Sequence, residues 1–320
     1  MATLLGLFFA LIILEICCQI YTLYLDKQWE AIKANSGHYF KASRHDSLVY
    51  ELASNFSMEK DNRRLWINRF GIREVENAIY DLPKIAILGD SVVFGIGLSQ
   101  EQTISSLLQE AINRTGASLK VLNFGVPGYG LDELVEYLKI KEKIYNVDQV
   151  IYILNPNDFA RRNSIYEGAD AGLYRMYYQP IFKSLWFLRK AIYRINKYNT
   201  LDDYHKLKAS VKWYQWLFKG NKDAGYDHIK EMALYANEKG ISFTVVLLPA
   251  GVAYNRNGSY GLSDMYESIG AFLKVNNINY IDPTDEFGSN VEKYFDPTDH
   301  LTFEGNVQMV EILRRYLEKR

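Results

Sequence analysis

The chain has 320 residues, of which 48% are hydrophobic and 23% are charged, and its formal net charge is -1. This composition is typical of a folded protein and excludes a disordered chain, a collagen and a basic nucleic-acid-binding tail. The two cysteines are Cys17 and Cys18. The rest of the chain therefore has no cysteine for a disulfide framework or for a cysteine-ligated zinc site.

The N-terminal segment is strongly apolar. Residues 4–25 read LLGLFFALIILEICCQIYTLYL, and about 20 such residues cross the hydrocarbon core of a bilayer. We predict one membrane-spanning helix, with residues 1–25 as the anchor of a single-pass membrane protein. A cleaved signal peptide fits less well, because no basic residue precedes the run and the run is longer than a signal-peptide core. Glu15 is costly at mid-membrane depth, so it either marks a contact with a partner helix or is a neutral residue tolerated in a single anchor.

After a polar lead-in at residues 26–80, the chain alternates between two kinds of pattern. Short runs rich in Ile and Val, typical of strands buried on both faces, occupy residues 84–88, 119–124, 149–154, 241–248 and 279–281. Helical patterns lie at residues 102–113, 132–145, 227–239, 263–275 and 305–319. This alternation predicts an α/β domain at residues 81–320, in which helices cover both faces of a parallel sheet and ligands bind at the carboxyl ends of the strands.

Residues 161–220 differ from the rest of this domain, and we interpret them as an insertion. They contain 12 Lys and Arg, 4 Asp and Glu, and 14 aromatic residues, so this segment is basic although the whole chain is not. Helical spacing of apolar residues predicts an amphipathic basic helix within it, with a stripe made of Ile181, Leu185, Leu188, Ile192 and Ile195. A small satellite core is one interpretation. We favour a lid or membrane-facing platform, whose contacts with an anionic surface would be Lys183, Trp186, Lys190, Arg194 and Lys197.

Four short blocks of polar residues and glycine stand at the expected strand ends and before the last helix. They are Gly89-Asp90-Ser91 after the first strand, residues 123–128 (NFGVPG) after the second, residues 155–158 (NPND) after the third, and residues 296–300 (DPTDH) before the last helix. In this order the blocks resemble those of the SGNH (GDSL-type) hydrolase superfamily. The resemblance implies a flavodoxin-like three-layer α/β domain, here a membrane-anchored member with a basic aromatic helical insertion.

The resemblance also implies a set of catalytic roles. Ser91 would be the nucleophile and His300 the base that removes its proton, since an imidazole changes charge near neutral pH. A carboxylate would hold the imidazole in the correct tautomer. The oxyanion hole would consist of the backbone N–H groups of Ser91 and Gly128 and the side-chain amide of Asn157.

Two positions depart from the family pattern. Asn155 stands where the third block usually has glycine, and Pro297 stands where the fourth block usually has the aspartate three residues before the histidine. Asp296 is our preferred catalytic carboxylate, because a four-residue turn can fold it back toward the ring. Asp299 remains the alternative, although adjacent side chains tend to diverge.

The sequence predicts a serine esterase or acyl hydrolase that acts on acylated envelope glycans or lipids through an acyl-enzyme on Ser91. One alternative is an O-acyltransferase that acts on cell-envelope polysaccharide beside a polytopic membrane acyl-donor partner, because a sugar hydroxyl can resolve the same acyl-enzyme. A second alternative is a glycan-binding module with a degenerate triad, in which neither Asp296 nor Asp299 would approach His300. No metal, organic cofactor or nucleic-acid partner is expected.

The side of the membrane is weakly indicated by charge. Lys27 and Lys33 follow the apolar run, offset by Asp26 and Glu30, which taken alone leans toward a cytoplasmic catalytic domain. Anchored members of the superfamily usually act on envelope substrates. We give this more weight and expect the catalytic domain outside the cytoplasm.

Overall fold

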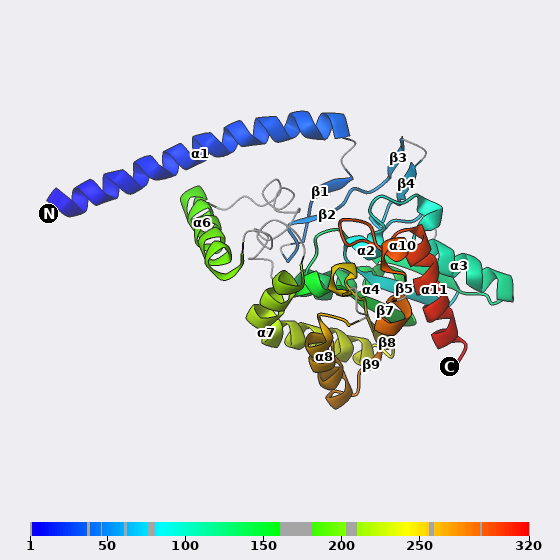
Figure 1. Cartoon of the computed structure of the whole chain (residues 1–320). Helices are drawn as coiled ribbons and strands as arrows, with labels where there is room; N and C mark the ends of the chain where they lie inside the picture. Colours follow the sequence, from blue (N-terminus) through cyan, green and yellow to red (C-terminus); the bar gives the residue numbers. More distant parts are fainter. Residues whose placement is uncertain are drawn as a thin grey trace.

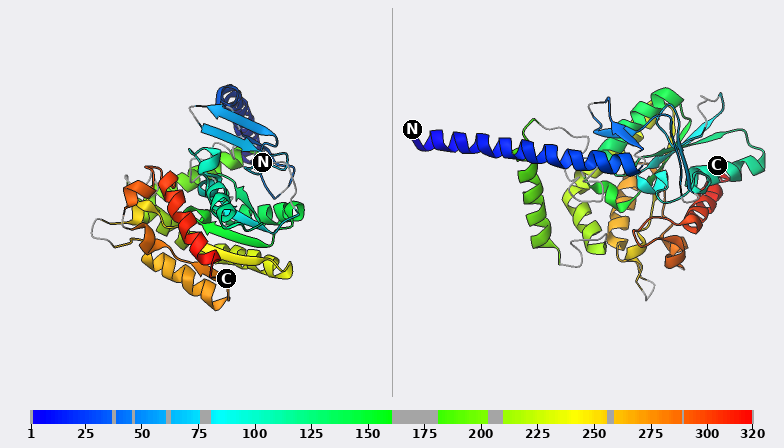
Figure 2. Two further views of the ribbon diagram at one scale, coloured as in Figure 1. Left: turned by 90° about the vertical axis from the view of Figure 1, so that its right-hand side faces the viewer. Right: turned by 90° about the horizontal axis from the view of Figure 1, so that it is seen from above.

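The computed structural model describes residues 2–36, 39–45, 47–60, 63–75, 81–160, 181–202, 210–255, 259–288 and 290–319. Its first element is α1 (Ala2–Ser36), which projects beyond the rest of the chain in Figure 1 and in the right-hand view of Figure 2. The segment Thr3–Tyr24 of α1 is long and apolar enough to cross a membrane. Most of its side chains are exposed, and Thr22 is buried. The expected N-terminal apolar helix is therefore present.

The lead-in forms two antiparallel hairpins. They are β1 (Phe40–Ala42) with β2 (Tyr50–Leu52), and β3 (Phe56–Lys60) with β4 (Arg63–Ile67). Tyr50, Leu52 and Ile67 are buried in the same hydrophobic cluster as residues of the main sheet. The polar lead-in thus packs against the α/β domain.

The centre of the molecule is a sheet of five parallel strands. These are β5 (Lys84–Gly89), β6 (Lys120–Gly125), β7 (Gln149–Leu154), β8 (Ser242–Leu247) and β9 (Asn279–Ile281). Their spatial order is β6-β5-β7-β8-β9, and every neighbouring pair is parallel. This is the flavodoxin-like order, in which the chain direction across the sheet reverses beside the first strand and leaves a crevice at the carboxyl ends there. The predicted fold class is confirmed.

Helices cover both faces of the sheet, because its strands alternate their side chains between two apolar layers. Ile85 and Ile87 of β5 pack in one cluster with α3 (Ile104–Thr115) and α11 (Phe303–Leu317). Ala86 and Leu88 belong to the other cluster, with α4 (Leu131–Tyr145), α7 (Val211–Glu238) and α8 (Ser263–Val275). Short helical turns complete the chain: α2 (Ser91–Phe94), η1 (Gln100–Gln102), η2 (Pro156–Phe159), η4 (Gly251–Ala253), α9 (Thr284–Phe287) and α10 (Val291–Tyr294).

Helix α7 begins earlier than the sequence pattern indicated. It starts at Val211 after the N-cap Ser210, whose hydroxyl accepts a hydrogen bond from the N–H of Trp213. Tyr214 and Leu217 of its first turns are buried in the main core. Residues 211–220, which we assigned to the end of the insertion, therefore belong to the packed α/β domain.

Helix α6 (Lys183–Thr200) is the amphipathic helix expected in the insertion, and it begins against α1. Both oxygens of the Glu15 carboxylate accept hydrogen bonds from its N-terminus: the Lys183 N–H at 2.8 Å, the Ser184 N–H at 2.9 Å and the Ser184 hydroxyl at 2.5 Å. The partner of Glu15 is thus a helix of the same chain.

The side chains of α6 differ in exposure. Lys183 and Trp186 are buried by this packing, which corrects our expectation that they contact an anionic surface. Arg194 is exposed, as are the stripe residues Leu185, Leu188, Ile192 and Ile195. The side chains of Lys190 and Lys197, and residues 161–180 and 203–209 of the expected insertion, lie outside the described residues.

Arg73 from the lead-in is the main internal support of the loop that follows β5. Its side chain is 1% exposed and donates hydrogen bonds to the carbonyl oxygens of Phe94, Gly95 and Leu98, each at 2.7 Å. Burial lowers the pKa of its guanidinium to about 10, so it remains charged at neutral pH. A planar guanidinium can bind several carbonyls at once, which a shorter or uncharged side chain cannot do.

We predict that Arg73→Met lowers the free energy of unfolding by at least about 3 kcal/mol, because three partly or fully buried carbonyls lose their donors. Arg64→Met is the matched control, since Arg64 is half-exposed in its ion pair with Glu101 and a surface pair contributes at most about 1 kcal/mol. Denaturant unfolding of the full chain in detergent measures both. Equal losses in the two variants would contradict the assigned role of Arg73.

Candidate active site

Ser91 lies at the carboxyl end of β5, in the first turn of α2. Asp90 caps this turn by accepting a hydrogen bond from the N–H of Val92 at 2.9 Å. The turn sits directly on the end of β6, because a Cβ atom at Gly125 would lie only 2.1 Å from the backbone nitrogen of Phe94. Only glycine fits at position 125, and this close approach sets Ser91 at the crevice of the sheet.

His300 meets Ser91 across this crevice. The Nε2 atom of His300 lies 2.9 Å from the Oγ atom of Ser91, although the two residues are 209 positions apart in the chain. His300 stands on the loop before α11, and a bridge between Phe295 and Leu301 closes that loop. The structure therefore brings together the serine and the histidine that the sequence blocks indicated.

Asp296, the preferred carboxylate, does not contact the imidazole directly. Its Oδ1 atom accepts hydrogen bonds from the N–H of Thr298 at 2.7 Å, from the Thr298 hydroxyl at 2.7 Å and from the N–H of His300 at 3.1 Å. The Oγ1 atom of Thr298 lies 2.9 Å from Nδ1 of His300. The turn does fold the carboxylate back, as expected, but onto the backbone and onto Thr298 rather than onto the ring.

Asp299, the alternative carboxylate, points away from the imidazole. Its Oδ2 atom accepts the hydroxyl proton of Tyr214 at 2.7 Å, and its Oδ1 atom accepts from the N–H of Val252 at 3.2 Å. Burial raises the pKa of this carboxyl group. The backbone of Asp299 has a φ of 68°, a left-handed conformation that turns its side chain away from that of His300. Asp299 therefore ties the His300 loop to α7, and the expectation that it completes the triad is corrected.

Asp90 connects the first and third sequence blocks. Its Oδ2 atom lies 3.1 Å from the Oγ atom of Ser91, and it accepts hydrogen bonds from the Asn155 amide at 3.3 Å and from the Asn157 amide at 3.2 Å. Asn155, the departure from the family pattern, thus contributes a side-chain donor that glycine would lack. An amide nitrogen carries two hydrogens, so the bond to Asp90 leaves Asn157 one more to donate.

Gly128 lies in the loop after β6 with a φ of 81°, a conformation that favours glycine. This loop is fixed from both sides. The N–H of Val126 donates to the carbonyl of Gly89 at 3.1 Å, and the hydroxyl of Tyr50 donates to the carbonyl of Pro127 at 2.7 Å. The lead-in hairpin therefore supports the segment that carries the second candidate oxyanion donor.

Asp158 is a buried carboxyl group beneath these residues. Its Oδ2 atom accepts the hydroxyl proton of Tyr152 at 2.7 Å and the N–H of Asn155 at 3.0 Å, and its Oδ1 atom is buried without a hydrogen-bond partner among the described residues. Burial, and then the nearby negative charge of Asp90, raise the pKa of Asp158 well above its ordinary value. Its protonated form is thus favoured by folding.

Thr298, Asp90 and Tyr214 are the contributors to this site that the sequence reasoning missed. The sequence signal for Thr298 was present, since the replacement of the usual aspartate by Pro297 left the hydroxyl as the next polar group in the block. Tyr214 had no signal, because it was assigned to the insertion. Within the described ranges, no three His, Cys, Asp or Glu side chains are grouped to hold a metal ion.

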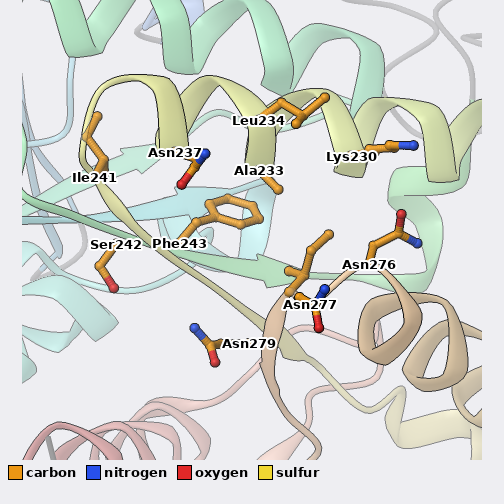
Figure 3. Close-up of a pocket in the computed structure, with 11 residues that line it drawn as sticks. Lys230, Ala233, Leu234, Asn237, Ile241, Ser242, Phe243, Asn276, Asn277 and Asn279 are labelled. Atoms are coloured by element: carbon orange, nitrogen blue, oxygen red, sulfur yellow. The ribbon is translucent and has the colours of Figure 1, made fainter.

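A separate pocket lies at the opposite edge of the sheet. It has a volume of about 410 Å³ and is lined at the amino ends of β8 and β9 by residues that include Ser242, Asn277 and Asn279 (Figure 3). Because Ser91 and His300 stand at the carboxyl ends of the strands, this pocket is not part of the candidate active site.

Comparison with known proteins gives matches among solved structures. No protein-family model matches the chain, and no curated protein matches it. A lipase/acylhydrolase from Enterococcus faecalis is 13% identical, with 75% of this chain and 97% of that chain covered and a TM-score of 0.47. A lipolytic protein of the G-D-S-L family from Desulfitobacterium hafniense is 17% identical, with 72% and 98% covered and a TM-score of 0.43. The acetyl xylan esterase AlAXEase is 14% identical, with 73% and 98% covered and a TM-score of 0.46.

These structural neighbours are lipases, acylhydrolases and esterases by name.

The raised pKa of Asp158 generates a pH prediction. A carboxyl group whose pKa is higher in the folded state contributes stability below its unfolded pKa and loses it as the pH rises through the folded value. Asp158→Asn removes the titrating group, so the variant does not lose this stability as the pH rises. The free energy of unfolding of the variant minus that of the wild-type chain should therefore increase between about pH 4 and pH 7. Asp223→Asn, an exposed change on α7, is the control. Denaturant unfolding at the two pH values measures the difference, and a pH-independent difference would contradict the assignment.

Proposed function

We propose that this chain is an SGNH-type serine ester hydrolase that forms an acyl-enzyme on Ser91. The observation that carries the proposal is the 2.9 Å contact between Ser91 Oγ and His300 Nε2 at the carboxyl edge of the sheet. A serine hydroxyl is a weak nucleophile until a base within hydrogen-bond reach removes its proton. The contact supplies that base.

The geometry supports a two-step reaction. Ser91 Oγ attacks the carbonyl carbon of the ester while its proton passes to Nε2 of His300. The N–H groups of Ser91 and Gly128 and the remaining amide hydrogen of Asn157 stabilise the oxyanion. The protonated Nε2 then gives its proton to the leaving alcohol, and the acyl group stays on Ser91. A water molecule, activated in turn by His300, releases the acid and restores the serine.

The substrate class is part of the proposal and rests on the anchor. An enzyme held at a membrane by α1 meets acylated glycans and lipids of the cell envelope, and these carry the ester bond that the reaction needs. A sugar hydroxyl in place of water would complete an O-acyl transfer instead. Analysis of the products decides between free acid and acylated glycan.

We predict that Ser91→Ala lowers the turnover of para-nitrophenyl acetate by at least about 10⁴-fold, because the nucleophile is lost. Ser57→Ala, an exposed change on the β3 hairpin, should leave the turnover unchanged. The assay uses the full chain in detergent, with the uncatalysed rate subtracted. Undiminished turnover in Ser91→Ala would remove Ser91 from the mechanism. A wild-type chain that neither hydrolyses esters nor transfers acyl groups to a glycan would instead favour a binding module.

The same proposal places α1 across a membrane, the start of α6 in the bilayer and the catalytic domain outside the cytoplasm. Glu15 lies near the middle of the apolar span and binds the first N–H groups of α6. Lipid around Glu15 would therefore also surround the first turns of α6. The exposed stripe on α6, with Leu188 55% exposed, has the apolar character that this environment requires.

We predict opposite labelling of two single-cysteine variants made in a Cys17→Ser, Cys18→Ser background. On intact spheroplasts, a membrane-impermeant maleimide should label Asp223→Cys on the catalytic domain, and it should label Leu188→Cys only after a denaturing detergent is added. Protection of Asp223→Cys until lysis would place the domain in the cytoplasm. Equally fast labelling of both variants would show that α6 lies in water.

A further inference from the structure

We propose that Thr298 is a positioning residue that sets the tautomer of His300, and that Asp296 acts on the imidazole through the Thr298 hydroxyl. This inference rests on the proposed function, because it concerns the base of that reaction. Three contacts in series connect Asp296 to Ser91: Asp296 Oδ1 to Thr298 Oγ1 at 2.7 Å, Thr298 Oγ1 to His300 Nδ1 at 2.9 Å, and His300 Nε2 to Ser91 Oγ at 2.9 Å.

The direction of each hydrogen bond follows from counting protons. A threonine hydroxyl has one proton and two lone pairs, and the proton of Thr298 is donated to the Asp296 carboxylate. Oγ1 can therefore only accept from His300, so Nδ1 must carry a hydrogen. A neutral imidazole has a single N–H, which leaves the lone pair on Nε2 for the proton of Ser91. The contacts thus select the tautomer that a serine nucleophile needs.

The orientation of the hydroxyl is a local property of the Asp-Pro-Thr turn. The chain contains a second copy, Asp282-Pro283-Thr284, in which the Thr284 N–H and hydroxyl also donate to the first aspartate, at 3.0 and 2.5 Å. The Thr284 turn has this geometry at a position without a catalytic histidine. The orientation of the Thr298 hydroxyl therefore does not depend on His300. The turn alone leaves the lone pairs of Thr298 Oγ1 available to accept a hydrogen bond from the imidazole.

The turn explains how the site works without the aspartate of the family pattern. Pro297 occupies that position, and a proline ring has no carboxylate to offer Nδ1 but favours the turn by fixing its own φ. In this chain the carboxylate lies one residue earlier, at Asp296, and it interacts with the imidazole through the neutral hydroxyl of Thr298. When His300 takes the proton of Ser91, Thr298 Oγ1 still accepts from Nδ1, and Asp296 stabilises that hydrogen bond.

The test compares the two threonines. We expect Thr298→Val, which keeps the shape and removes the hydroxyl, to lower kcat by about 10- to 100-fold with little change in KM, the range for one lost hydrogen bond to a charged group. Thr298→Ser should restore most of kcat. The matched control Thr284→Val breaks the same turn away from the site and should change kcat by less than about twofold. Full activity in Thr298→Val would overturn the proposal.

A double-mutant cycle tests the path through Thr298. Asp296→Asn should lower kcat in the wild-type background and cause little further loss in Thr298→Val, because both changes remove the same link. Full additivity of the two losses would mean that Asp296 acts by another route.

The tautomer can be measured without any turnover. In the full chain with ¹⁵N-labelled histidine at about pH 9, His300 should carry its hydrogen on Nδ1, and this preference should weaken in Thr298→Val but not in Thr284→Val. His300→Gln assigns the signal. A hydrogen on Nε2 in the wild-type chain would overturn the proposal even if the protein is an esterase. An Nδ1–H that depends on Thr298 in a chain without Ser91-dependent activity would instead support the relay and count against the proposed function.

Discussion

The contact between Ser91 Oγ and His300 Nε2 depends on the strand order of the parallel sheet. Because β5 lies between β6 and β7 and all three strands are parallel, the loops that follow these strands begin side by side at the carboxyl ends of the strands. The loop before α11 reaches the same edge from the far end of the chain and completes the 2.9 Å contact. The sheet thus positions the proposed nucleophile, and the C-terminal loop positions the proposed base.

The site is braced by segments outside the four sequence blocks. Arg73 binds three carbonyls of the loop after Ser91, Tyr50 holds the loop that carries Gly128, and Tyr214 holds the loop of His300 through Asp299. Each of these three residues has a buried polar side chain, and each donates its hydrogen bonds to a different loop of the candidate site. The lead-in and the start of α7 therefore help to position the residues of the candidate site, although neither contains a recognisable catalytic motif.

The fold and the Ser91–His300 pair could be predicted from the sequence because both depend on local patterns. The short runs rich in Ile and Val predicted the five strands to within one or two residues at each end. The order of the four blocks indicated Ser91 and His300, which the structure brings into contact. The carboxylate that acts on His300 could not be predicted in the same way. Its identity depends on the hydrogen bond that the Thr298 hydroxyl donates to Asp296 and on the left-handed backbone conformation of Asp299. The contact between Glu15 and α6 also could not be predicted from local patterns, because α6 begins 168 residues after Glu15 in the chain.

The central claim is that His300 activates Ser91 for attack on an acyl group, and covalent trapping tests it most directly. The full chain in detergent is treated with a fluorophosphonate, which reacts with activated serine hydroxyls, and the modified peptide is located by mass spectrometry. The account predicts a single adduct on Ser91 that forms at least about 10³-fold more slowly in His300→Gln. An adduct on another residue, or labelling of Ser91 at an equal rate without His300, would contradict it.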